Sequence, residues 1–175
     1  KELLFAATLT NETTIKKKIY TNTVELHNDW RGYNNIACMH LADGNLNEAM
    51  ILLDKAESLG GNQSDILVNK GILAARKGEL SNAQRLFDKA NASELNQAIL
   101  DIRQGEYKKA GRFFKNGKSH NAALAQLMHG KNSASCNEAT GACYYLNAIA
   151  ATRSGNHYAA INNLRNAFSA DIKYK

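Results

Sequence analysis

Apolar residues along this chain recur at helical spacing, in runs that end at a glycine and restart shortly after it. After four of these glycines, a small residue follows at the fifth position, an apolar residue at the ninth and another small residue at the twelfth. The small residues at the fifth position are Ala49, Ala83, Ala110 and Ala160. A pattern repeating at this scale indicates a helical repeat protein, because one helical hairpin cannot bury its own apolar side and must stack on a neighbour.

The pattern predicts helices arranged in pairs. The predicted helices cover residues 12–27, 30–43 and 47–59, 65–77 and 82–91, 94–104 and 107–115, 119–129 with a short helix at 133–137, and 141–154 and 157–169. Residues 1–8 are expected to end an earlier helix. Ser81 and Gln84 form a capping-box pattern at the start of residues 82–91, the second helix of its pair. We expect the four alanines to be buried where the helices of a hairpin cross, since only a small side chain allows close approach there.

The first two stop glycines, Gly44 and Gly78, are 34 residues apart and are flanked by a recurring motif. The motif residues are Tyr33, Ile36 and Ala37 in the first unit, Leu67 and Gly71 in the second, and Tyr144, Ala148 and Ala151 in the last. Over about residues 29–170, this motif resembles the tetratricopeptide repeat. The later intervals of 27 and 25 residues, and the absence of Pro, depart from that family's pattern.

The resemblance implies an all-α fold, a right-handed α-solenoid of stacked helical hairpins. Residues 1–28 would form an N-terminal helix pair packing on the solenoid, and residues 29–175 about five hairpins, the later ones shortened. We expect one continuous structural unit. Its weakest part should lie between Gly130 and Gly141, where polar residues leave little apolar surface for a second helix.

A second resemblance concerns cellular location. Residues 3–7 (Leu-Leu-Phe-Ala-Ala) and residues 29–35 (Asp-Trp-Arg-Gly-Tyr-Asn-Asn) look like the helical-repeat region found beside OmpA-like domains in envelope proteins of some Gram-negative bacteria. This resemblance implies a periplasmic or envelope-associated segment of a larger protein. A cytoplasmic location is the alternative.

The predicted first helices share polar residues at fixed distances from their stop glycines. Asparagine lies nine positions before the glycine, and arginine two: Asn35, Asn69, Asn96 and Asn121, and Arg76, Arg103 and Arg153. The two positions are seven residues apart, nearly two helical turns, so they share a helix face. In tetratricopeptide repeats the first helices line a concave groove. The asparagines and arginines could therefore bind a peptide backbone and its carboxylates. Alternatively, each Asn bonds to the adjacent helix, and the arginines are solvated or pair with local acids.

We therefore predict a non-catalytic protein–protein interaction or scaffold module that binds a protein or peptide in this groove. The net charge of +6 gives an alternative, a basic helical module that binds nucleic acid or an anionic glycan. The cations are dispersed, which makes nucleic acid the less favoured partner. No phosphate loop or nucleophile elbow occurs, so we expect neither an enzyme nor a cofactor. No apolar run has the roughly 18 residues of a transmembrane segment.

The three cysteines are expected to play different parts. Cys38 lies in an apolar helical run and is expected to fill space in the core. Cys136 and Cys143 flank a junction between helices, where a disulfide is sterically possible and two free thiols are the alternative. His129 joins them in a loose cluster, but its spacing is not that of a metal site, so we expect no metal ligands.

Overall fold

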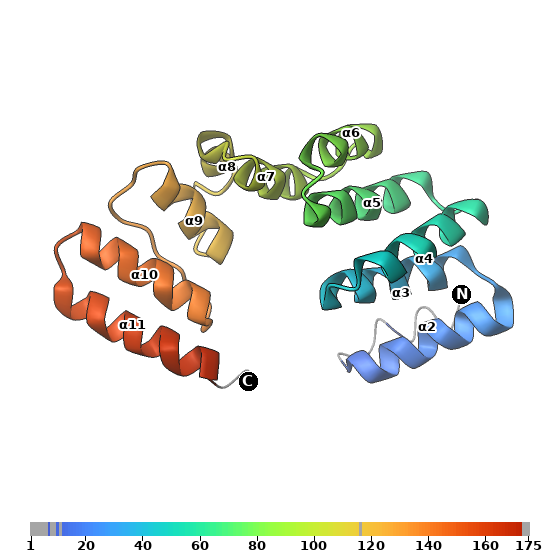
Figure 1. Cartoon of the computed structure of the whole chain (residues 1–175), viewed down its shortest axis with the longest axis horizontal. Coiled ribbons are helices and arrows are strands. Elements are labelled where there is room, and N and C mark those ends of the chain that lie inside the picture. The colour runs from blue at the N-terminus through green and yellow to red at the C-terminus, as the bar shows by residue number, and fades with distance from the viewer. Residues whose placement is uncertain (1–6, 8–9, 11, 116, 173–175) are drawn as a thin grey trace. The chain divides into compact units, whose positions relative to one another are not determined.

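The computed structural model describes residues 7, 10, 12–115 and 117–172, and within them every regular element is an α-helix (Figure 1). The helices are α2 (Thr13–His27), α3 (Trp30–Asp43), α4 (Leu46–Ser58), α5 (Gln63–Lys77), α6 (Leu80–Ala90), α7 (Glu94–Arg103), α8 (Tyr107–Phe113), α9 (His120–Met128), α10 (Gly141–Arg153) and α11 (His157–Ile172). The all-α prediction is confirmed for these residues. The helix predicted at residues 1–8 lies outside them, apart from Ala7.

Contacts between the helices fall into two compact units, Lys1–Ala92 and Ser93–Lys175. In the first unit α3 pairs with α4 and α5 with α6, while α2 packs on α3 and α4 on α5. In the second unit α7 pairs with α8 and α10 with α11, while α9 packs on both α8 and α10. Consecutive helices therefore pack pairwise, as in helical-repeat proteins. A right-handed solenoid and a single continuous unit stay predictions.

The stop glycines end the first helices in one shared backbone arrangement. Gly44, Gly78, Gly105, Gly130 and Gly155 all have φ between 77° and 92°, a region that favours glycine. At Gly44, for example, the next amide, of Asn45, donates to the His40 carbonyl at 2.9 Å, and Gly44 donates to Leu41 at 3.2 Å. These two bonds define the Schellman motif, which satisfies the last carbonyls of a helix. The glycine pattern of the sequence thus marks real helix ends.

The first helices begin differently from the second helices α4, α6 and α8, whereas α11 is capped by Asn156, which accepts from the Ala159 amide at 3.0 Å. At the N-termini of the first helices, the side chain of the N-cap residue accepts a hydrogen bond from a backbone amide of the first turn. These N-cap residues are Asp29, Asn62, Ser93, Ser119 and Thr140. Helices α4, α6 and α8 follow directly on tight turns, and their N-cap residues make no such bond. The capping box predicted at Ser81 and Gln84 is therefore wrong: α6 begins at Leu80, and the Gln84 amide donates to Asp88 instead.

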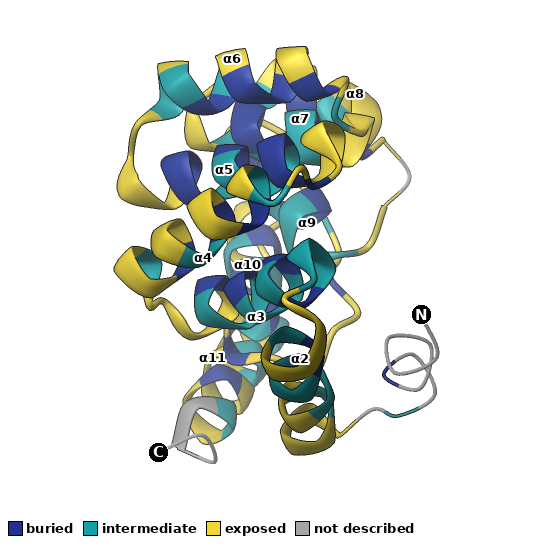
Figure 2. Cartoon of the chain, turned by 90° about the vertical axis from the view of Figure 1, so that its right-hand side faces the viewer, coloured by how far each residue is buried: buried dark blue, intermediate teal, exposed yellow. Residues whose placement is uncertain are grey.

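Small residues allow the helices to approach closely. Ala49, Ala83 and Ala110 are fully buried and Ala160 nearly so, which confirms the expectation for these positions. Figure 2 shows buried residues on the facing sides of the paired helices. Gly71 lies against the Phe87 ring so closely that an added Cβ would come within 2.4 Å of a ring carbon. The α5–α6 pair therefore has no room for a larger residue at position 71.

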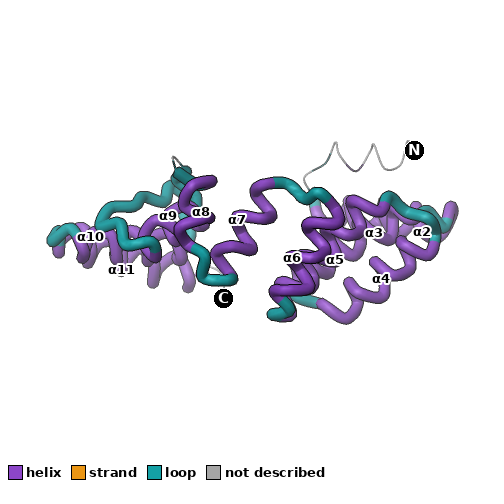
Figure 3. Tube along the Cα trace, turned by 90° about the horizontal axis from the view of Figure 1, so that it is seen from above, coloured by secondary structure: helices purple, strands orange, loops and turns teal. Residues whose placement is uncertain are grey.

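The fourth hairpin departs from the prediction. No helix forms at residues 133–137, and residues 131–140 run as a loop from α9 to α10 (Figure 3). This segment is rich in Ser and Asn, whose side chains compete with the backbone for hydrogen bonds and disfavour a helix. The stop at Gly130 is nevertheless complete, because Lys131 donates to the Gln126 carbonyl at 3.0 Å. The unit has therefore kept its first helix and replaced its second by a loop.

Candidate functional site

The recurring spacing of Asn and Arg on the first helices corresponds, in the first unit, to contacts between helices. The Asn69 amide on α5 donates to the side-chain oxygen of Asn34 on α3 at 2.8 Å. In the last turn of α5, the Arg76 guanidinium donates to the backbone carbonyl of Leu41, near the end of α3. A cation is favoured there by the partial negative charge at a helix C-terminus. Asn35 is half-buried on α3.

The second unit repeats the arginine contact. Arg153 at the end of α10 donates to the Leu127 carbonyl of α9 at 2.6 Å and to the Lys131 carbonyl at 3.3 Å. Asn96 and Asn121 are half-buried, and Arg103 is exposed at the end of α7. The contact of Asn69 with an adjacent helix is that of the structural interpretation. Arg76 and Arg153 differ from it, because they donate to backbone carbonyls instead of being solvated or pairing with local acids. Binding of a peptide by these residues stays a prediction.

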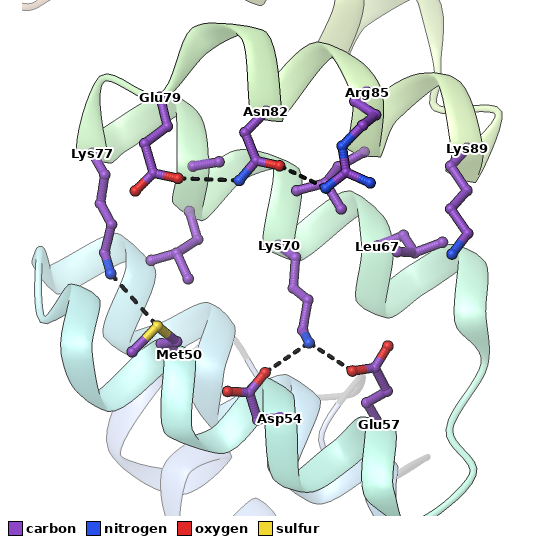
Figure 4. A pocket seen from close by; sticks show the side chains of 13 residues that line it. Met50, Asp54, Glu57, Leu67, Lys70, Lys77, Glu79, Asn82, Arg85 and Lys89 are labelled. Carbon is purple, nitrogen blue, oxygen red and sulfur yellow. Dashed lines mark hydrogen bonds and ion pairs between the residues drawn. The ribbon is translucent and has the colours of Figure 1, made fainter.

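A pocket of about 390 Å³ opens between α4, α5 and α6 in the first unit (Figure 4). Its apolar lining comes from the two helices of one hairpin and from the preceding helix: Leu67, Leu73 and Ala74 of α5, Leu86 of α6 and Met50 of α4. Met50 is 40% exposed and the others are buried. The pocket therefore has a closed apolar floor with one accessible thioether at its edge.

Lys70 lies in this pocket between two carboxylates of α4. Its Nζ is 2.7 Å from Asp54 Oδ1 and 2.7 Å from Glu57 Oε2. Burial acts to lower the pKa of Lys70, but the hydrogen bonds to Asp54 and Glu57 outweigh it and raise the pKa above its usual value. Lys70 thus balances one of the two negative charges on the acidic wall of the pocket.

The opposite wall, on α6, is basic. Arg85 and Lys89 are one turn apart and both line the pocket. Arg85 donates to the Asn82 side-chain oxygen at 2.9 Å. Within the described part of the chain, neither Arg85 nor Lys89 has a carboxylate partner. Lys77 Nζ, 3.6 Å from Met50 Sδ, adds a third cation at one end (Figure 4). The wall can therefore accept negative charge from a ligand.

The sequence analysis did not identify this pocket. The four-residue spacing of Arg85 and Lys89 and the seven-residue spacing of Lys70 and Lys77 each place two cations on one helix face. Those spacings alone do not distinguish a pocket from a solvated surface. The pocket forms because α4 and α6 both pack against α5, so it depends on tertiary contacts between three helices.

A second, smaller pocket of about 290 Å³ lies on the α10–α11 hairpin and is lined chiefly by apolar groups, including Tyr145, Ile149 and Leu164. Exposed apolar residues continue from it along α11: Tyr158, Ile161 and Phe168. Tyr145 is 56% exposed. The lining of this pocket contains few charged groups, which distinguishes it from the α4–α6 pocket with its acidic and basic walls.

The loop between α9 and α10 is fastened by a disulfide between Cys136 and Cys143, whose Cα atoms are 5.3 Å apart. The two cysteines are buried together with Ala123, Leu127, Leu146 and Ala150. The Asn147 side chain accepts from the Cys136 amide and donates to the Cys136 carbonyl, both at 2.9 Å. Asn147 therefore holds the loop backbone as a neighbouring strand would. Cys38 is a free, half-buried thiol whose pKa is raised by burial.

One acidic residue lies beside this disulfide. Glu138 accepts a hydrogen bond from the His120 amide at 3.2 Å, and its other oxygen is 3.8 Å from Cys143 Sγ. The donor atoms of Cys136, Glu138 and Cys143 all lie within 4.8 Å of one another. Along the sequence His129 forms a loose cluster with the cysteines, but within the described residues the third member of the cluster is Glu138.

The described helices include none long and apolar enough to cross a membrane. Comparison with protein-family models and with curated proteins finds no match to this chain. Membership of the tetratricopeptide-repeat family therefore stays a prediction, and what the structure shows is consecutive helices that pack pairwise.

Proposed function

We propose that this chain is a non-catalytic protein-interaction module, and that its α4–α6 pocket binds an acidic segment of a partner protein. The observation that carries the proposal is the pair Arg85 and Lys89, two cations without carboxylate partners among the described residues, beside an apolar floor. A carboxylate of the partner would meet these cations, and an apolar side chain would contact Met50. Helical-repeat proteins commonly present such extended binding surfaces.

Charge distribution favours a peptide over a polyanion. The pocket carries Asp54, Glu57 and Glu79 as well as its cations, so a uniformly charged backbone would meet repulsion along part of its length. A peptide can place a single carboxylate at Arg85 and Lys89 and leave the acidic wall free. Binding of nucleic acid or an anionic glycan remains the alternative, since the net charge of +6 favours it.

The test is selection of 12-residue peptides from a displayed random library on the full chain. We expect selected peptides to combine Asp or Glu with Leu, Met or Phe. The double variant Arg85→Glu/Lys89→Glu should weaken a selected peptide at least tenfold, about 1.4 kcal/mol. The control Lys17→Glu/Lys18→Glu makes the same change of charge on the exposed side of α2, outside the pocket, and should leave the affinity within about twofold.

Two results would contradict the proposal. The first is selection of peptides without acidic residues. The second is a selected peptide that binds the pocket variant and the control variant with equal affinity, because its binding site would then lie outside the α4–α6 pocket. Heparin or single-stranded DNA, tested in parallel, would support the alternative if either bound more tightly than the peptides. Its affinity would then fall by orders of magnitude between about 50 and 200 mM salt.

We further propose that the chain belongs to a larger protein of the bacterial cell envelope and faces the periplasm. The resemblance of residues 3–7 and 29–35 to envelope repeat regions supports this location. A disulfide between Cys136 and Cys143 also supports this location, because disulfides form and persist in oxidising compartments such as the periplasm. Trapping the thiols with a mass-tagged alkylating reagent in intact host cells tests it. We expect Cys38 alone to react without prior reduction, and a fully reduced pair would argue for the cytoplasm.

A further inference from the structure

The cluster formed by Cys136, Glu138 and Cys143 has the composition of a metal site. It offers two sulfur donors and one oxygen donor within 4.8 Å of one another. Paired thiolates select Zn²⁺ over the harder divalent cations. We propose that when the two cysteines are in their dithiol form, these three side chains bind Zn²⁺, with water as the fourth ligand.

The distances suit a tetrahedral ion. Zinc–sulfur bonds of about 2.3 Å and zinc–oxygen bonds of about 2.0 Å place neighbouring donors roughly 3.5 to 3.8 Å apart. Cys143 Sγ and Glu138 Oε2 are already 3.8 Å apart. Once the disulfide is reduced, rotation of the cysteine side chains can separate the two sulfur atoms and adjust the distance from Cys136 Sγ to Glu138, which is already within 4.8 Å. Each thiol loses a proton when the metal binds, so the disulfide form, which has no thiolate, does not bind it.

Residues around the cluster hold its donors in position. Glu138 accepts from the His120 amide, which orients its carboxylate. The Asn147 amide fixes the backbone of Cys136 through two hydrogen bonds. Cys143 lies in the first turn of α10, where its amide donates to the Thr140 hydroxyl at 3.2 Å. Such supporting contacts keep ligands in place and strengthen metal binding.

The site has an open side. Both cysteines are buried, at 5% and 0% exposure, whereas Glu138 and its neighbours Asn137 and Ala139 are exposed. Solvent can therefore reach the fourth position. A zinc ion here would join the loop to α10 in the same way as the disulfide does, so the loop would stay fastened under reducing conditions.

The experiment uses the full chain, reduced and then freed of reductant without oxygen. Titration with Co²⁺ should give near-ultraviolet thiolate-to-cobalt absorption that saturates at one ion per chain, and Zn²⁺ should abolish it. The disulfide form should give no such absorption. Because this measurement uses the unaltered protein, it does not depend on the folding of any variant. Absence of the absorption from the reduced protein would overturn the proposal.

Variants then identify the donors. Glu138→Gln keeps an oxygen that can accept from His120 but removes the charge, so it should weaken Zn²⁺ binding at least tenfold. Cys143→Ser should abolish the cobalt–thiolate signal of the pair. The controls Cys38→Ser and His129→Ala should bind as the unaltered protein does. Unchanged affinity in Glu138→Gln, or loss of binding in either control, would show that the three-donor site is wrong.

Discussion

The α5–α6 hairpin and the unit that begins with α9 have the same helix stop but cover the first helix by different means. In the former, α6 places Ala83, Leu86 and Phe87 into the core. In the latter, a loop contributes one buried residue, Cys136, and depends on a disulfide and on the side chain of Asn147. A repeat can thus lack its second helix if a disulfide and a few hydrogen bonds replace the apolar contacts that this helix would make. The two regions should consequently fail under different conditions.

The largest expected effect is on the apolar region. Phe87→Ala removes a ring that is 4% exposed and packs on Gly71. We expect the free energy of local opening of α5 and α6, measured by amide hydrogen exchange, to fall by about 3–5 kcal/mol. The control Ile51→Ala, at an exposed position of α4, should change it by less than about 0.5 kcal/mol. An equal loss in α9 and α10 would show that the two regions do not open separately.

Reduction of the disulfide should affect the loop instead. The bridge closes a short segment, since the two cysteines are seven residues apart. Loss of this closure should lower the opening free energy of residues 131–150 by about 2.5 kcal/mol on the chain-entropy scale. The measurement compares hydrogen exchange of the oxidised and reduced chain in the presence of a metal chelator. Exchange in α5 and α6 should not change, and any acceleration there would contradict the comparison.

Asn147→Ala tests the two hydrogen bonds between Asn147 and the backbone of the same loop. The substitution leaves the amide and carbonyl of Cys136 without their partner. Leaving partly buried polar groups unsatisfied should cost about 1–3 kcal/mol. The control Asn166→Ala removes an exposed Asn from α11. If the two variants exchanged equally in residues 131–140, the bonds of Asn147 would not be what stabilises the loop.

The smallest expected effect is a loss of stability of the first unit at high pH, when Lys70 loses its proton. The pKa of Lys70 is raised by its bonds to Asp54 and Glu57, which outweigh the effect of burial. Its contribution to stability is therefore fully present below the unfolded pKa of about 10.4 and is lost as the pH rises through the folded pKa. Chemical denaturation at rising pH should show a loss below about 1 kcal/mol. The variant Lys70→Met should lack that loss, and identical pH profiles would contradict this role.

The sequence predicted the helix ends well because they depend on local chemistry. A glycine at positive φ determines a Schellman stop by itself, so all five stops could be located without knowledge of packing. The buried alanines followed from the same register. The capping box failed because Ser81 lies inside the first turn of α6, one residue beyond its start. A tight turn had already begun the helix, and no side-chain cap was needed.

The candidate sites were harder to predict because they depend on contacts between distant residues. Asn147 lies eleven residues from Cys136, and nothing in its neighbourhood marks it as a partner of the loop. Glu138 became a candidate ligand only because the loop brings it beside Cys143. The α4–α6 pocket likewise requires three helices to converge. Sequence patterns identify which residues share a helix face but not which faces meet.

The arginines Arg76 and Arg153 have a consequence for how such a chain can change in length. Each binds a carbonyl at the end of the preceding first helix, Leu41 and Leu127 respectively. The end of each of these two first helices is thus completed by a residue of a later first helix. Evolution or protein engineering could therefore delete hairpins here most safely where the carbonyls of Leu41 and Leu127 still meet an arginine.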